Sequence, residues 1–320
     1  MLDVCVIGHV VRDINTIGGA EYEPQPGGAA YYSTMVYRSL GLRTAVVTRV
    51  AAADELRLLA ELRRAGVTIF NRPTRRTTTF RNFYAPDNPD LRVQRVDAFA
   101  APITVDDLPD LHARIWQIGP LTENDIDPAI ISHCAQLGGT VGMDVQGLTR
   151  QVVDGEVRPR GPAREMGYLC DLDVLKADED EILIFTGERT IAAAVAKVQR
   201  AGVREVLVTR GSRGSTVFGP RQRFEIAAVP PHHMADATGC GDTYLAAYLA
   251  RRLVTDDLAE CGAFAAAAAT LKIENLGAFR SSLAEVADRL ALFASALEEG
   301  AAGMGPLRLG AETGSDGTGS

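Results

Sequence analysis

The sequence is poor in cysteine, and the few cysteines follow no pattern. Five are scattered along the 320 residues, and no two form a C-x-x-C pair. An odd, scattered set fits neither a disulfide framework nor a zinc site. The five histidines show no metal-ligating arrangement either. We therefore interpret the cysteines as reduced thiols and expect a cytoplasmic protein.

Positive charge and long apolar runs are also scarce. The formal net charge is -8, so the chain lacks the positive footprint that nucleic-acid binding requires. The apolar run Ala263–Leu271 is too short to span a bilayer. The N-terminal residues have no basic flank followed by a long apolar core, as a secretory signal would. We expect neither a nucleic-acid partner nor a membrane partner.

The dinucleotide-binding fingerprint is missing. The first predicted strand is followed by Gly8-His-Val-Val-Arg-Asp13, which does not contain G-x-G-x-x-G. This argues against a nicotinamide-dependent oxidoreductase, although the predicted fold class would suit one.

Short β-branched runs do alternate with amphipathic stretches. Strands are predicted at residues 4–8, 44–50, 115–119, 140–145, 173–177 and 205–209. Helices are predicted at residues 30–40, 54–65, 128–137, 190–201, 242–253, 258–273 and 283–297. This alternation predicts an α/β fold with a doubly wound, mostly parallel sheet flanked by helices. Ligands bind such sheets at the carboxyl ends of the strands.

Residues 74–104 break this rhythm. They read as two strands joined by a Pro-Asp-Asn-Pro-Asp turn with no helix between them, which predicts an antiparallel pair. Together with residues 12–25, after the first strand, they could form a small β-sheet lid; an ordinary surface hairpin is the alternative. Residues 298–320 are rich in Gly, Ser and Thr and are predicted to be a flexible tail outside a domain of residues 1–297.

The run Asp236-Ala-Thr-Gly-Cys-Gly-Asp242 leads into a helical pattern. Its two glycines, Gly239 and Gly241, allow a sharp turn and a close approach to a ligand. The free amides and the positive end of the helix dipole then form an anion site. Asp242 falls in the first turn, where acidic residues are common in any helix. Its position alone therefore does not establish a function.

The whole run resembles the C-terminal motif of the ribokinase-type (PfkB) carbohydrate kinases, and the resemblance covers about residues 2–297. It implies a ribokinase-like fold with a small β-sheet lid and ATP-dependent phosphorylation of a hydroxyl on a small molecule. By this resemblance Asp242 is the catalytic base, and Gly239, Cys240 and Gly241 form an anion hole for the transferred phosphate. This suits phosphoryl transfer, which depends on positioning and charge stabilisation.

The resemblance also assigns donor and metal residues. Lys176-Ala-Asp178-Glu-Asp-Glu181 resembles a family element that organises Mg²⁺, with Asp178 in place of the usual Asn; a plain acidic helix start is the alternative. Asp178 and Glu181 are the metal candidates. The residues assigned to ATP are Lys176, Thr209, Gly211, Gly214, Thr238, Gly239 and Gly241. The sequence leaves a requirement for a monovalent cation such as K⁺ open.

The acceptor is suggested by two further elements. Ribokinase-like members typically carry Gly-Gly-Lys-Gly-Ala-Asn where this chain has Gly27-Gly-Ala-Ala-Tyr-Tyr32, which resembles the myo-inositol kinase branch. Asp144-Val-Gln146-Gly-Leu-Thr-Arg150 also resembles that branch. The residues assigned to the substrate are Asp13, Gly27, Gly28, Asn82, Gln146, Arg150 and Asp242. A carboxylate such as Asp13 can accept two hydroxyl hydrogen bonds, which suits a polyol.

Two other interpretations stay open. A nucleoside kinase of the same family would need an aromatic stacking partner, and Tyr31, Tyr32, Phe80 and Phe83 are candidates. A catalytically weak sensor of sugars or nucleotides would fit the unusual Asp178, but has no need for Asp242. The resemblance further implies a homodimer formed through the lid, because an exposed sheet edge favours pairing.

Overall fold

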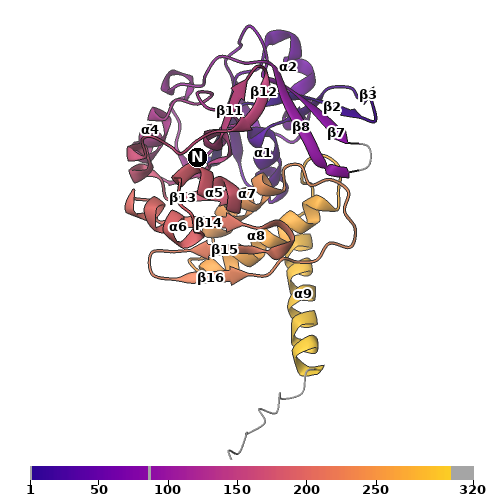
Figure 1. The fold of residues 1–320 in the computed structure, drawn as a ribbon, viewed down its shortest axis with the longest axis vertical. Helices are drawn as coiled ribbons and strands as arrows, with labels where there is room; N and C mark the ends of the chain where they lie inside the picture. The colour runs from indigo at the N-terminus through magenta and orange to yellow at the C-terminus, as the bar shows by residue number, and fades with distance from the viewer. Residues whose placement is uncertain (1, 86–87, 304–320) are drawn as a thin grey trace, which may run out of the picture.

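The computed structural model describes residues 2–85 and 88–303, and Figure 1 shows its layered body with a second sheet on one side. A sheet of nine strands forms the centre of the described chain. In spatial order they are β16 Arg223–Ile226, β15 Ser215–Phe218, β14 Glu205–Thr209, β13 Val174–Asp178, β10 Thr140–Asp144, β9 Ala113–Ile118, β1 Leu2–Ile7, β5 Thr44–Thr48 and β6 Thr68–Asn71. Neighbours pair in parallel except at β14–β15 and β15–β16, which are antiparallel.

Both faces of this sheet are buried, which explains the near-continuous apolar runs of its strands. In β1, Val4 and Val6 point to one core cluster, while Cys5 and Ile7 point to the other. The first core is closed by α1 Ala29–Ser39, α7 Cys240–Arg252 and α8 Leu258–Ile273. The second is closed by α4 Ala129–Leu137, α5 Glu179–Thr186 and α6 Ile191–Arg200. The predicted α/β fold, a mostly parallel sheet flanked by helices, is confirmed.

A second sheet lies against one end of this body (Figure 1). Its strands are β11 Arg150–Val153, β12 Glu156–Pro159, β8 Asn88–Ala98, β7 Thr79–Ala85, β2 Val11–Ile17 and β3 Ala20–Glu21, with β4 Gln25–Gly27 paired to β2. The predicted antiparallel pair in residues 74–104 is β7 and β8. The segment after the first strand joins the same sheet, because β2 pairs with β7.

Several elements differ from the prediction. The strands β6, β11, β12, β15 and β16 were not predicted, because strands of four residues carry little periodicity. The helix predicted over residues 54–65 is divided at Leu59 into α2 Ala52–Leu58 and α3 Ala60–Arg64. The last helix, α9 Leu283–Gly303, continues past the predicted end at residue 297. The rest of the predicted tail, residues 304–320, lies outside the described residues.

Three short 3-10 helices also shape the site or its surroundings: η2 Gln146–Thr149, η3 Gly167–Asp171 and η4 Gly211–Arg213. A fourth, η1 Val105–Asp107, follows the second sheet. None of the helices in residues 2–85 and 88–303 combines the length and the apolar character needed to cross a membrane.

Candidate active site

The turn before α7 is built around Gly239. This residue is the N-cap of α7 with φ 78° and ψ 5°, a left-handed conformation that favours glycine. The Thr243 amide and hydroxyl both donate to the Gly239 carbonyl, at 2.9 and 2.8 Å. A Cβ at residue 239 would lie 2.5 Å from the Tyr32 ring. Backbone conformation and space therefore both require glycine here.

The amides at this helix start are not equivalent. The Cys240 amide donates to the Ala237 carbonyl at 3.2 Å, because the left-handed turn directs it back along the chain. The first backbone amides of a helix have no acceptor within the helix. In α7, the two such amides that follow Cys240 belong to Gly241 and Asp242. The anion hole that the resemblance assigns to Gly239, Cys240 and Gly241 stays a prediction, in which the Cys240 amide would first have to leave the Ala237 carbonyl. Burial raises the pKa of the Cys240 thiol to about 11, which also argues against a nucleophilic role at neutral pH.

Asp242 has the environment of a general base. It lies in the first turn of α7 and keeps a partly exposed surface, so a ligand can reach it. Burial raises its pKa to about 7, and the Asp144 charge adds to this rise, while Lys176 and Arg150 act against it. A carboxylate with a pKa near neutrality can both accept and release a proton at physiological pH.

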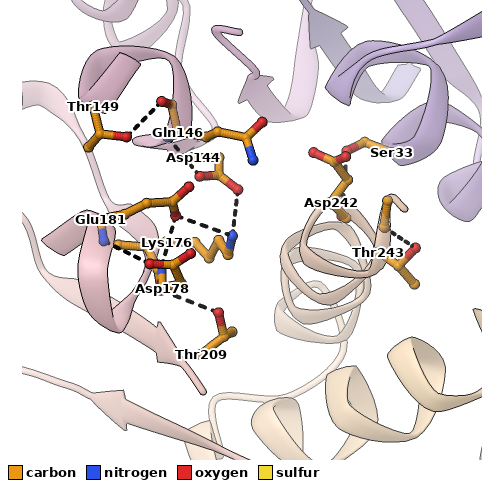
Figure 2. Close-up of polar contacts among 12 residues, drawn as sticks. Ser33, Asp144, Gln146, Thr149, Lys176, Asp178, Glu181, Thr209, Asp242 and Thr243 are labelled. Atoms are coloured by element: carbon orange, nitrogen blue, oxygen red, sulfur yellow. Dashed lines mark hydrogen bonds and ion pairs between the residues drawn. The ribbon is translucent and has the colours of Figure 1, made fainter. Parts of the chain in front are cut away.

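A buried ion pair faces Asp242. The Lys176 ammonium lies 2.8 Å from Asp144 Oδ2 and 3.9 Å from Glu181 Oε2, as Figure 2 shows. Burial by itself would lower the pKa of Lys176, but the charges of Asp144 and Glu181 raise it above its usual value. A Cβ at Gly241 would come within 2.8 Å of Lys176 Nζ. A permanent positive charge thus lies beside the amides at the start of α7.

Asp178 and Glu181 bind each other's backbone at the start of α5. The Glu181 amide donates to Asp178 Oδ1 at 2.7 Å, and the Asp178 amide donates to Glu181 Oε2 at 2.9 Å. This capping box explains both acidic residues without a metal. It uses one oxygen of each carboxylate, and the second oxygens suit a Mg²⁺ ion that keeps most of its water. Burial and the Glu181 charge raise the pKa of Asp178, so a cation here would relieve repulsion.

The described residues contain no group of three or more His, Cys, Asp or Glu side chains that could enclose a metal ion. A magnesium ion would therefore be held mainly by water, by the Asp178–Glu181 pair and by the phosphates that it accompanies. Its chemical contribution would be to neutralise charge on the transferred phosphate.

The predicted donor turn follows β14. The Arg210 amide donates to the Gly214 carbonyl at 2.8 Å, which closes the turn around η4. Gly211 has φ 56°, and a Cβ there would meet nothing within 4 Å. The Thr209 hydroxyl donates to the Ala177 carbonyl at 3.4 Å. In the register of β13 and β14, Thr209 is paired with Asp178. The turn therefore lies beside the start of α5, with an open backbone surface at Gly211.

Thr238 belongs to the same end of the molecule. Its amide donates to Asp236 Oδ1 at 2.9 Å, which holds the segment that leads into Gly239. The predicted donor residues thus gather at the carboxyl ends of β13 and β14 and at the start of α7.

The predicted substrate residues from the N-terminal part, Asp13, Gly27 and Gly28, lie on or directly beside the paired strands β2 and β4. A Cβ at Gly27 would lie only 1.9 Å from Asp13 Oδ2, so glycine leaves the space that the carboxylate occupies. Gly28 has φ 88°, and its Cβ would lie 2.6 Å from the His9 carbonyl. Burial raises the pKa of Tyr32, and the charges of Asp13, Asp236 and Asp242 act in the same direction. Tyr32 therefore has both Asp13 and Asp242 as neighbours.

A row of amide side chains crosses the inner face of the lid. The Asn82 amide group donates to Asn15 Oδ1 at 3.0 Å, and Gln94 donates to Asn82 Oδ1 at 2.9 Å. Asp13 lies two residues before Asn15 on β2, so it shares this face. Phe80 lies two residues before Asn82 on β7, so its side chain points to the same face. It packs in an apolar cluster near the start of α1, with Val11, Ala29, Val96 and Leu121. The face with the amides is therefore the one turned toward the body of the protein.

Gln146 and Arg150 enter from η2 and β11. Figure 2 shows the Gln146 side chain extended toward Asp242. The Arg150 charge acts on Asp242 and lowers the pKa of its carboxyl. The fold thus brings Gln146, Arg150 and Asp242 together from separate parts of the chain.

Some residues of the site were not assigned from the sequence. Asp144 was considered only as part of a motif, yet it forms an ion pair with Lys176. Its position at the end of a predicted strand could have identified it as a site residue. Ser33 donates to the Asp242 carbonyl at 3.5 Å and accepts from Gln117 at 2.7 Å. Asn15 and Gln94 complete the lid row. No local pattern marks these side chains, because their partners are distant in sequence.

The match to a family model covers the part of the chain that contains this helix start. Residues 149–284 match the model described as "pfkB family carbohydrate kinase". This part of the chain is therefore similar to the carbohydrate kinases of that family. A pyrophosphate-dependent kinase of the ribokinase family, solved with a pyrophosphate analog and myo-inositol, is similar in structure to this chain. Its TM-score is 0.77 at 26% identity, over 87% of this chain and 97% of that one. The predicted ribokinase-like fold is confirmed.

Two curated relatives match over shorter segments. A ribokinase from Arabidopsis thaliana is 37% identical over 119 residues, which are 35% of this chain and 31% of the relative. A nucleoside kinase from Methanocaldococcus jannaschii is 35% identical over 75 residues, which are 23% of this chain and 25% of the relative. The chain thus aligns with only about a third and a quarter of these two relatives.

Proposed function

We propose that the protein is a kinase that transfers the terminal phosphoryl group of ATP to a hydroxyl of a small polyol, with myo-inositol or a related cyclitol as the first choice. The observation that carries this proposal is Asp242, whose pKa is raised to about 7 at the start of a helix that offers an anion site. The match of residues 149–284 to the carbohydrate kinase family supports a phosphotransferase.

The geometry suits in-line transfer. The acceptor hydroxyl would donate its proton to the Asp242 carboxylate as its oxygen bonds to phosphorus and the bond to the leaving phosphate breaks. The amides of Gly239 and Gly241, with the Lys176 ammonium beside them, would stabilise the charge on the transferred group. The lid would exclude water, which could otherwise accept the phosphate. We assign Thr209, Gly211, Gly214 and Thr238 to donor binding.

The inner face of the lid favours a polyol. Amide side chains offer both donors and acceptors, and the row Asn15, Asn82 and Gln94 extends along the same face as Asp13. A ring that carries only hydroxyls could use all of them. We therefore assign Asp13, Gly27, Gly28, Asn82, Gln146 and Arg150 to the acceptor, and Gly27 leaves the space that the Asp13 carboxylate occupies.

A nucleoside kinase is the second candidate, since one curated relative is a nucleoside kinase. The four aromatic side chains considered for stacking are already engaged or face away. The Tyr31 hydroxyl donates to Glu61 at 2.5 Å, Tyr32 lies under Gly239, and Phe80 packs in an apolar cluster. Phe83 alternates with Asn82 on β7, so it points to the outer face. These contacts favour a polyol over a nucleoside.

A screen of donors and acceptors tests the proposal. The purified protein is incubated with Mg²⁺ and either ATP or pyrophosphate, and with myo-inositol, other cyclitols, pentoses, hexoses or nucleosides. We expect ADP release with ATP that depends on a cyclitol, and a phosphomonoester product visible by phosphorus NMR. If an acceptor is phosphorylated with pyrophosphate and not with ATP, the donor in our proposal is wrong and the reaction class is kept. Ligand-induced shifts in melting temperature without any turnover would favour the sensor interpretation.

The pH dependence should report the Asp242 carboxyl. Because the ionised form is the base and its pKa is about 7, kcat/KM should rise about tenfold per pH unit below neutrality and level off above it. The Arg150→Gln variant provides a specific check. Arg150 lowers the pKa of Asp242, so its removal should move the acidic limb to higher pH. A profile that stays flat through neutrality would contradict the role of Asp242.

We further propose that residues 1–297 form one kinase domain whose lid consists of residues 74–104 and 12–25, now extended by β11 and β12. Val93 on β8 is about half exposed, at 51%, and lies on the face of the lid opposite Asn82 and Gln94. Pairing of two copies through the lid stays a prediction.

A further inference from the structure

Lysine is rare in this chain, and two of its three lysines lie in the interior. Thirty of the thirty-three basic residues are arginine, and the lysines are Lys176, Lys197 and Lys272. Lys176 belongs to the site described above. The Lys272 side chain, near the end of α8, is 0% exposed. An ammonium is a compact point charge that the planar guanidinium of arginine does not replace, so these buried positions point to a specific need for it.

The Lys272 ammonium is surrounded by oxygen atoms from two loops. It donates to the Asp236 carbonyl at 3.0 Å and lies 3.3 Å from Asp236 Oδ2. It also donates to the Asn275 carbonyl at 3.2 Å. Its three N–H groups therefore all have acceptors, which a fully buried charge requires. One acceptor residue precedes α7 and the other follows α8.

The same two loops are also joined through their backbones. The amides of Ala235 and Asp236 both donate to the Ile273 carbonyl, at 2.8 and 3.1 Å. The Gly277 amide donates to Asp236 Oδ2 at 3.3 Å, while the other oxygen of that carboxylate accepts from Thr238. Thr238 is the residue directly before Gly239. A short chain of contacts thus runs from Lys272 through Asp236 to the turn that forms the anion hole.

The charge of Lys272 also reaches the start of α7. Burial is the main influence on the pKa of Cys240, and it raises it; the Lys272 charge acts in the opposite direction. A positive charge behind these amides would add to the attraction of the site for a phosphate group.

We propose that Lys272 is a positioning residue whose ammonium serves as a built-in monovalent cation behind the anion hole, so that turnover needs no dissolved K⁺ or NH₄⁺ at this point. Carbonyl and carboxylate oxygens are the ligands that a K⁺ ion accepts in place of water, and here the ammonium takes them. The inference rests on the proposed kinase function and answers the question of a K⁺ requirement that the sequence left open.

The test compares cations in the wild type and in two variants. In a buffer whose monovalent cation is tetramethylammonium, wild-type turnover should not change when KCl is added. Lys272→Ala should lose kcat on the order of a hundredfold, with little change in the KM for the acceptor, because the anion hole is misplaced. K⁺ or NH₄⁺ should restore the lost turnover, while Li⁺ should not. Lys272→Met, which fills the space, should lose turnover without being restored.

A second readout separates this proposal from the proposed function. The melting temperature of Lys272→Ala should rise with K⁺ or NH₄⁺ and not with Li⁺, whether or not any acceptor is phosphorylated. Lys197→Ala is the matched control, since Lys197 is 38% exposed and its ammonium donates to the Thr186 carbonyl away from the site. It should show neither effect.

Three outcomes would overturn the proposal: strong activation of the wild type by K⁺, undiminished turnover of Lys272→Ala without added cations, or a folded Lys272→Ala that responds equally to all cations. If Lys272→Ala does not fold, the proposal is tested with the wild type and Lys272→Met. Cation-independent wild-type turnover, together with a folded but inactive Lys272→Met, would then support the proposal.

Discussion

The Asp242→Asn variant should lose kcat by about 10²–10⁴-fold, the usual contribution of a general base. The amide keeps the size of the carboxyl and the start of α7, but it cannot accept the proton of the hydroxyl. Binding of the donor should persist, because it depends on backbone amides and on Lys176. Turnover is followed by product formation, and donor affinity by titration calorimetry. Turnover within about tenfold of the wild type would show that Asp242 is not the base.

The same substitution should not destabilise the fold. The pKa of Asp242 is raised from 3.8 to about 7 by burial, so the carboxyl holds its proton more tightly in the folded protein. The stability that the protonated Asp242 carboxyl contributes is therefore lost as the pH rises from about 4 to about 7. Above that range the ionised carboxylate destabilises the folded protein. The asparagine side chain carries no charge, so the Asp242→Asn variant should melt at an equal or higher temperature at pH above 7, and the difference should shrink toward acid pH. Asp256→Asn is the control, because the Asp256 side chain is fully exposed.

The Gly239→Ala variant should lose kcat by about 10²–10³-fold, the range seen when an oxyanion-type donor is removed. Alanine disfavours the left-handed conformation of residue 239, and its Cβ would lie 2.5 Å from the buried Tyr32 ring. The turn must therefore shift, and the amides that it positions move with it. Steady-state kinetics gives the loss, and the melting temperature shows whether the fold survives.

Gly41→Ala separates the effect on the site from the effect of backbone strain. Gly41 has φ 85°, and a Cβ there would meet nothing within 4 Å, so this variant should lose only a little stability. We expect normal turnover for Gly41→Ala and a large loss for Gly239→Ala, measured at a temperature at which both variants are folded. Equal kinetics in the two variants would mean that the Gly239 turn does not position the transferred phosphate.

The helix start at Asp242 and the order of strands and helices could be predicted because they depend on neighbouring residues. Two glycines before an amphipathic run specify a turn into a helix, and buried parallel strands show as apolar runs. The lid was predicted only in part. β7 and β8 carry a clear pattern, whereas β11 and β12 have four residues each, too few to show one.

The chemical properties of the site were decided by the tertiary structure. The raised pKa of Asp242 depends on burial and on the Asp144 charge, which no sequence pattern contains. The structure also shows that Asp178 and Glu181 form a capping box and that the Cys240 amide is bound to Ala237. The capping box is the acidic helix start that the sequence left open as the alternative to a metal site, and the Ala237 carbonyl occupies one amide of the predicted anion hole.

The sequence by itself determined the fold class, the helix start at Asp242 and the choice of Asp242 as the candidate base, because these follow from local conformation and from periodic burial. Only the tertiary structure decided what surrounds that base. It set the amide row on the lid and the Lys176–Asp144 pair, and it placed Lys272 between two loops. The physical reason is that desolvation and charge interactions depend on distances in space, and the fold joins residues here that lie far apart along the chain.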